Sequence, residues 1–251
     1  MAENKLYCGT SGFAYPSWKP GFYPEKLPSA KFLSYYSTRL NAVEINYTYR
    51  RIASASTFEK WIAGTPPHFM FLPKAHMKIT HSLKLKDAED FTRLFLESLE
   101  PLRSASRLGP ILFQLPPSFK ADLPRLAEFV RLLPQINRYV FEFRNASWFN
   151  EDVYKILRAS NAGLCQAENE NMETPHVLTA DFVYLRLRKP DYTESELTEI
   201  QRRTQQYLRN GYLTFAIFKH EDTPAGAMYA ERLLGAPGNQ ATLLDSLVQN
   251  E

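Results

Sequence analysis

Charged and amide side chains interrupt several short apolar runs of the chain, and these residue types can support binding or catalysis. Glu44 and Asn46 lie in one run rich in Val, Ile and Tyr, and Glu142 and Arg144 lie in another rich in Val and Phe. Residues separated by one position share a face of a β-strand. Because an unpaired charge is costly to bury, each of these side chains requires an ion-pair partner or a functional role.

Cationic side chains outnumber carboxylates within these runs and directly after them. The cations are Lys74, Arg144, Arg186, Arg188 and Lys219. Glu44 and Glu142 oppose them, so the set has an excess of positive charge that requires an anion. A phosphate or carboxylate ligand would supply it, since each charge-assisted hydrogen bond contributes about 1.5–3 kcal/mol. A purely structural network of ion pairs is the alternative interpretation for any single residue of the set.

Proton transfer is the chemistry that we expect from Glu44 and Glu142. Burial and neighbouring cations tune the pKa of a strand-borne carboxylate. The cations would keep both groups ionised, which suits a base or a metal ligand, so His81 or His220 is the better proton donor. A metal site is not favoured, because no HExxH, HxH or CxxC spacing occurs in the chain. No metal ligands are assigned, and the cofactor is left open.

Small polar and aromatic residues complete the candidate binding site. The loop Gly9-Thr10-Ser11-Gly12 has two glycines that let backbone amides approach a ligand closely. Aromatic residues near the same loops could stack on a sugar or a base, or close the top of a barrel. The candidate substrate-binding residues are Thr10, Ser11, Asn46, Lys74, Gln114, Arg144, Trp148, Arg186, Arg188 and Lys219.

Eight short runs rich in Val, Ile, Phe and Tyr alternate with longer segments of helical period, which is the pattern of repeated βα units. The predicted strands are Leu6 to Gly9, Ala42 to Tyr47, Phe69 to Lys74, Pro110 to Leu115, Tyr139 to Arg144, Gly163 to Ala167, Phe182 to Arg188 and Leu213 to Lys219. The predicted helices are Ala30 to Leu40, Ser56 to Trp61, Ala88 to Ser104, Leu123 to Leu132, Asp152 to Ser160, Glu194 to Arg209 and Ala227 to Leu234.

An α/β fold of the TIM-type (β/α)8 barrel class follows from eight such units, because eight parallel strands close into a barrel. About a dozen polar residues separate Ala167 from Asp181, so the sixth crossover is degenerate or contains one short helical turn. In such barrels the active site lies at the carboxyl ends of the strands, where the candidate residues gather. No linker or repeat is visible, which indicates a single domain over 1–251, with the barrel at about 5–236 and a tail at 237–251.

The sequence indicates a cytoplasmic protein, and its charge balance does not indicate a dedicated nucleic-acid binder. The 251 residues carry a net charge of +3 from 30 basic and 27 acidic side chains. The amino-terminal residues lack the apolar segment of a secretory signal, and no run is long and apolar enough to span a membrane. Cys8 and Cys165 each lie in an apolar run, so we expect buried free thiols and a reducing compartment.

Several short motifs occur in order along the chain. They are Gly9-Thr10-Ser11-Gly12, Val43-Glu44-Ile45-Asn46, Lys74-Ala75, Thr80-His81, Phe113-Gln114-Leu115-Pro116-Pro117-Ser118-Phe119, Glu142-Phe143-Arg144 and Ser147-Trp148. Together this set resembles the YecE-like family, domain of unknown function 72, from about Tyr7 to Leu234. The resemblance implies a barrel similar in plan to sugar isomerases and to metal-dependent endonucleases that act on abasic DNA, but no established reaction.

The resemblance also implies a set of pocket residues that agrees with the candidates above. These are Glu44, Asn46, Lys74, His81, Gln114, Glu142, Arg144 and Arg186. The chain has Asn145 where many relatives have His, and it reads Arg186-Leu187-Arg188-Lys189 where they read RxHG. These departures indicate ligand differences among subfamilies.

The leading functional prediction is a hydrolase or isomerase that acts on an anionic, phosphate- or sugar-containing substrate at the carboxyl-terminal rim of the barrel. Arg144, Arg186 and Lys74 would position the substrate, while Glu44, Glu142 and His81 would transfer protons. The second prediction is a protein that binds or processes nucleic acid and resembles metal-dependent endonucleases. The third is a noncatalytic small-molecule sensor. No oligomeric state follows from the sequence.

Overall fold

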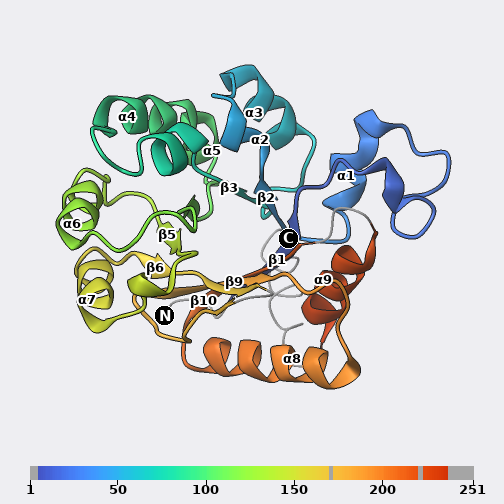
Figure 1. Ribbon diagram of the computed structural model, residues 1–251. Coiled ribbons are helices and arrows are strands. Elements are labelled where there is room, and N and C mark those ends of the chain that lie inside the picture. The colour runs from blue at the N-terminus through green and yellow to red at the C-terminus, as the bar shows by residue number, and fades with distance from the viewer. Residues whose placement is uncertain (1–4, 170–171, 220–222, 237–251) are drawn as a thin grey trace.

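The computed structural model describes residues 5–169, 172–219 and 223–236, and its strands lie at the centre of the fold (Figure 1). The strands are β1 (Leu6–Ser11), β2 (Ala42–Ile45), β3 (Met70–Pro73), β4 (Ile111–Gln114), β5 (Tyr139–Glu142), β6 (Gly163–Leu164), β7 (Gln166–Asn169), β8 (Met172–Glu173), β9 (Phe182–Leu187) and β10 (Leu213–Phe218). Their positions agree with the eight predicted strands, with β6 and β7 together forming the sixth.

The strands close into a ring of parallel neighbours. One sheet has the order β3-β2-β1-β10-β9-β7-β8, and a second has the order β4-β5-β6. Isolated parallel bridges, Phe71 to Leu108 and Lys74 to Leu112, join β3 to the β4 side. At the other junction Cys165 alone separates β6, which pairs with β5, from β7, which pairs with β9. The closed ring confirms the expected α/β barrel.

Helices surround the ring of strands (Figure 1). They are α1 (Phe32–Tyr36), α2 (Tyr47–Arg50), α3 (Ala55–Ala63), α4 (Glu89–Ser98), α5 (Glu100–Ser104), α6 (Leu123–Arg131), α7 (Glu151–Ala159), α8 (Glu194–Arg209) and α9 (Ala225–Gly235). The single helix predicted over Ala88 to Ser104 is two helices. Pro101 lies in the first turn of the second one, and its missing N–H cannot continue the hydrogen bonding of the first.

The sixth crossover lacks a helix in the residues that the structure describes, which is the degenerate form of the two alternatives expected. After β7 the chain turns back, and β8 pairs with it antiparallel, with Glu168 opposite Glu173. Residues 174–181 are then irregular. The Thr179 hydroxyl anchors this segment, because it accepts from the Leu164 N–H at 2.8 Å and donates to the Ala162 carbonyl at 2.7 Å. No helix of the described residues is long and apolar enough to cross a membrane.

The barrel interior changes from apolar to polar along the strands. Near the amino ends, Tyr7 and Phe215 stack with ring centroids 5.2 Å apart, within a buried apolar cluster. That cluster also contains Ala42, Leu72, Leu112, Val140 and Tyr184. Two residues further along the same strands, the inward positions are Glu44, Lys74, Gln114, Glu142 and Arg186. The alternation of strand side chains therefore brings the polar candidates together at the carboxyl ends.

Candidate functional site

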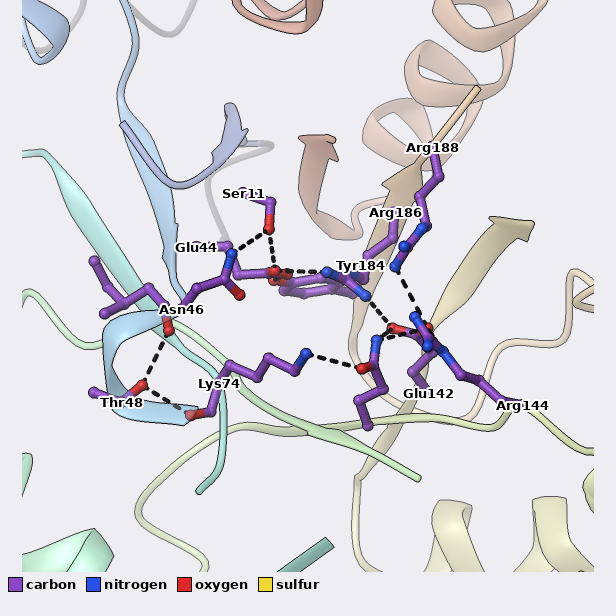
Figure 2. Close-up of polar contacts among 12 residues, drawn as sticks. Ser11, Glu44, Asn46, Thr48, Lys74, Glu142, Arg144, Tyr184, Arg186 and Arg188 are labelled. Atoms are coloured by element: carbon purple, nitrogen blue, oxygen red, sulfur yellow. Dashed lines mark hydrogen bonds and ion pairs between the residues drawn. The ribbon is translucent and has the colours of Figure 1, made fainter. Parts of the chain in front are cut away.

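One guanidinium group joins two carboxylates across the barrel interior. Arg186 of β9 donates from Nη2 to Glu44 Oε1 of β2 at 2.7 Å, and from Nη1 to Glu142 Oε2 of β5. These three side chains, of which 3%, 0% and 2% is exposed, form a continuous chain of contacts in Figure 2. We call Glu44, Arg186 and Glu142 the buried bridge. The two carboxylates neutralise Arg186, and the contacts link β9 to both β2 and β5 across the barrel interior.

Glu44 has two further donors that complete its hydrogen bonding. The Ser11 hydroxyl donates to Oε1 at 2.8 Å and the Tyr184 hydroxyl donates to Oε2 at 2.9 Å, while Asn46 Nδ2 donates to Ser11 Oγ at 3.0 Å. Burial raises the pKa of Glu44, but the charges of Arg186 and Lys74 outweigh it, and the pKa lies below its ordinary value. Glu44 is therefore ionised at neutral pH.

Glu142 is held by an amide and by two more cations. Gln114 Nε2 donates to both carboxylate oxygens at 2.9 Å. Arg144 Nε donates to Oε1 at 3.0 Å, and Arg188 Nη1 lies 4.0 Å from the same oxygen. Burial raises the pKa of this carboxyl, but Arg186, Arg144 and Arg188 outweigh it and hold the pKa well below its usual range. Glu142 is therefore also ionised at neutral pH.

Lys74 lies at the end of β3 beside this network. Its Nζ donates to Gln114 Oε1 at 2.8 Å and lies 4.3 Å from the ring centroid of Tyr49. Burial, followed by the charge of Arg186, lowers the pKa of Lys74 from 10.5 to about 8. His81 packs edge-on against the same tyrosine with ring centroids 5.4 Å apart, and burial and the charges of Lys74 and Arg144 lower its pKa below 6.5.

The site has a buried base and a partly exposed rim. Arg144 and Arg188 expose 28% and 17% of their side chains, whereas the buried bridge is almost inaccessible. Lys74 and His81 are also half-buried. Four cations face the two carboxylates, so at neutral pH this group of described residues has two positive charges in excess. The excess lies on the exposed side, where an anion could reach it.

The comparison with protein families agrees with this architecture. A family model described as protein of unknown function DUF72 matches residues 7–250. The chain belongs to the DUF72 family. This confirms the resemblance to the YecE-like family that the ordered motifs indicate.

Among DUF72 relatives, UPF0759 protein YunF of Bacillus subtilis is 30% identical over 156 residues, which is 60% of this chain and 54% of that protein. The chain thus spans about half the length of the curated relative that it matches. The crystal structure of a DUF72 family protein from Thermotoga maritima has a TM-score of 0.79 at 26% identity and covers 96% of this chain and 99% of its own.

The fold alone extends to an AP endonuclease of family 2 from Brucella melitensis. The TM-score is 0.52 at 9% identity, and the match covers 92% of this chain and 96% of the endonuclease chain. In the described part of this DUF72 chain, no three His, Cys, Asp or Glu side chains are grouped to hold a metal ion. The candidate donor His220 lies outside the described residues.

Two candidate residues lie away from the network, contrary to the expectation. The Thr10 side chain faces outward and bonds to the Tyr36 hydroxyl at 2.9 Å and the Gly12 carbonyl at 2.7 Å, because Ser11 takes the inward position. Trp148 is fully buried behind the strands, where its ring stacks on Phe143 at 4.7 Å and its N–H donates to a backbone carbonyl. Both therefore support the scaffold rather than line the barrel mouth.

Two other placements refine the expected roles. Arg186 is buried and has direct contact with both carboxylates, so it holds Glu44 and Glu142 in place. Lys219 is half-buried directly after β10, and its backbone N–H donates to the Leu187 carbonyl at 2.8 Å. It shares the inward face of Phe215 and Ile217 by alternation.

Tyr184 belongs to the network but is absent from the predicted set, whereas Tyr49 is one of the loop aromatics that the sequence indicates for stacking. Tyr184 reads as a core aromatic because apolar residues flank it, yet it precedes Arg186 by two positions and shares its face. Tyr49 lies on α2, which follows β2, and its position over Lys74 depends on the fold. The spacing of Tyr184, Arg186 and Arg188 is the signal that could have identified the first of these.

Proposed function

We propose that this DUF72 protein is an enzyme, of the hydrolase or isomerase class, that acts on an anionic substrate carrying phosphate or sugar groups. The observation that carries the proposal is the excess of two positive charges on the partly exposed rim above the buried bridge. A charge excess that is held rigidly and half-desolvated attracts an anion more strongly than the same charges in water.

Arg144 and Arg188 are the anion-binding residues of the proposed site. Arg144 contacts Glu142 through Nε, and within the described part of the chain its two terminal amino groups have no hydrogen-bond partner. A guanidinium group presents its donors in a planar fork that fits phosphate and carboxylate oxygens. Arg188 lies at 4.0 Å from Glu142, a weak contact that an anion could replace.

His81 is the proton acceptor of the proposed site, beside two ionised carboxylates whose lowered pKa values make them weak bases. Glu44 and Glu142 have pKa values below the ordinary value, so both are ionised at neutral pH. The pKa of His81 is also lowered, so its ring is neutral there and accepts a proton more readily than it donates one. In this proposal His81 accepts a proton, whereas the sequence indicates a proton donor at this position.

A protein that binds or processes nucleic acid is the second candidate. Tyr47 is 42% exposed after β2, and Arg51 lies 5.8 Å from its ring centroid, so an aromatic and a cation are presented together near the rim. Such pairs stack bases and contact phosphates. A steep loss of oligonucleotide affinity with rising salt would favour this candidate over a small-molecule enzyme.

Titration calorimetry with inorganic phosphate and a panel of sugar phosphates tests the leading proposal. We expect binding to the native protein, and a loss of roughly 100-fold or more in the double variant Arg144→Ala and Arg188→Ala, since it removes two charge-assisted contacts. Arg93→Ala is the matched control, because Arg93 pairs with Asp90 on the exposed face of α4. Equal phosphate affinity of the two variants would refute the proposal, and binding without turnover of any panel member would indicate a sensor.

A further inference from the structure

Lys74 is a half-buried amine that is anchored by a neutral group. Its Nζ donates to Gln114 Oε1 at 2.8 Å, and the face of the Tyr49 ring lies 4.3 Å away (Figure 2 shows the amide contact). Among the described residues, no carboxylate lies within ion-pair distance of this nitrogen. A lysine without a direct counter-ion and out of bulk water is poorly stabilised as an ammonium ion.

Gln114 is the residue that keeps Glu142 away from the amine. Its Nε2 donates to both oxygens of Glu142 at 2.9 Å, which turns its carbonyl oxygen towards Lys74. That oxygen accepts a hydrogen bond from the protonated amine and, less strongly, from the neutral amine, since both have N–H groups. The amine therefore stays in place when it loses its proton, and its lone pair is available away from Gln114.

The amine is also neutral often enough to react. With a pKa of about 8, set by burial and by Arg186, roughly 10% of Lys74 is neutral at pH 7, against about 0.03% for an ordinary lysine. Desolvation and a neighbouring cation are the two means by which proteins activate a lysine as a nucleophile.

We propose that Lys74 forms a Schiff base with an aldehyde or ketone group of the substrate. The inference rests on the proposed function, because Arg144 and Arg188 would bind the anionic group of the same molecule. The substrate class is then a phosphorylated or carboxylated carbonyl compound, and the reaction belongs to the isomerisations that pass through an iminium ion.

The bond changes balance without a further reactant. The nitrogen lone pair attacks the carbonyl carbon, the C=O electrons move to oxygen, and a proton moves from nitrogen to oxygen to give a carbinolamine. After this hydroxyl takes up a second proton, supplied by solvent at the partly exposed rim, water leaves as the nitrogen lone pair forms the C=N bond. The iminium ion carries the positive charge that the ammonium ion carried, so the ring of Tyr49 and the carboxylates of Glu44 and Glu142 stabilise it.

Borohydride trapping tests the inference with glyceraldehyde 3-phosphate as the probe. We expect a reduced adduct in the native protein, located on Lys74 by peptide mapping, and competition by inorganic phosphate. The rate of adduct formation should rise from pH 6 to pH 8 and then level off, following the neutral amine. Lys74→Arg should form no adduct at this position. Lys78→Arg is the control, because Lys78 is an exposed lysine four residues further along the chain, and this variant should form the same adduct on Lys74.

Competitive acetylation of the native protein needs no variant and gives a second readout. We expect the reactivity of Lys74 to have a midpoint near pH 8, and a midpoint near 10.5 would overturn the inference. An adduct spread over exposed lysines and missing from Lys74 would also overturn it. If phosphate still binds through Arg144 and Arg188 in that case, the proposed function stands without the Schiff base. If neither the Lys74 adduct nor phosphate binding is found, both the Schiff base and the proposed function are rejected.

Discussion

Replacement of Arg186 by methionine tests the buried bridge directly. Arg186→Met removes the cation between Glu44 and Glu142 but keeps a long, flexible side chain in the barrel interior. Both carboxylates are buried, and their removal from water is then no longer offset by the guanidinium. Breaking a buried ion pair from one side costs about 3–5 kcal/mol. For a domain of this size, this corresponds to a decrease of roughly 6–20 °C in Tm.

The loss of stability should depend on pH in a direction that identifies its cause. In the native protein both glutamates have folded-state pKa values below 4.5, so their stabilising contribution is present above about pH 4.5 and is lost as pH falls through the folded pKa. In the variant, burial without Arg186 raises the pKa of Glu44 above its unfolded value. The free energy of unfolding that the substitution removes is then largest at pH 7.5. It decreases as pH falls towards 5, where the Glu44 carboxyl takes up a proton.

Urea unfolding followed by circular dichroism at pH 7.5 and pH 5 measures both effects. Arg93→Met is the control for the change of side chain, because Arg93 lies in an exposed ion pair with Asp90 and should contribute at most about 1 kcal/mol. Adding Glu44→Gln and Glu142→Gln to Arg186→Met should recover much of the lost free energy. A deficit under about 1 kcal/mol at pH 7.5, or an equal deficit at pH 5, would refute the assigned role of the bridge.

Two further predictions concern the scaffold. A Cβ at Gly9 would lie 1.8 Å from the Ala42 carbonyl oxygen, so Gly9→Ala should separate β1 from β2 and greatly lower Tm in a thermal melt. A Tm equal to that of the native protein would contradict this packing. Cys8 and Cys165 are buried free thiols whose pKa values burial raises, so neither should react with a disulfide reagent at pH 8 until urea unfolds the chain, and rapid labelling of the folded protein would contradict their placement.

The barrel was predictable because its signals are local. Short apolar runs of β-branched and aromatic residues recur between amphipathic segments, and each run is long enough for one strand. The inward direction of Glu44 and Glu142 follows from alternation within a strand. Their shared partner Arg186 could not be assigned, because contacts between strands 142 and 44 residues apart depend on how the ring closes.

The errors have equally specific physical causes. Thr10 and Ser11 are both predicted to bind a ligand, but neighbouring residues of a strand face opposite sides, so only Ser11 faces the barrel interior. Trp148 follows a strand by six positions, and the short helical turn Ala146–Trp148 directs its ring into the core. Tyr184 was missed because tyrosine within an apolar run does not reveal whether its hydroxyl has a polar partner.

The buried bridge is better explained by what it positions than by the stability it provides. A buried ion pair is often no more stabilising than well-packed apolar residues of similar volume, and the inward positions just below it are apolar already. The contacts instead form a sequence in which Arg186 holds Glu142, Glu142 fixes the amide of Gln114, and Gln114 anchors the amine of Lys74. An apolar layer could not orient Gln114 or lower the pKa of Lys74 through a neighbouring cation. The ionic layer therefore fits a site that prepares one amine and two partly exposed guanidinium groups for a ligand.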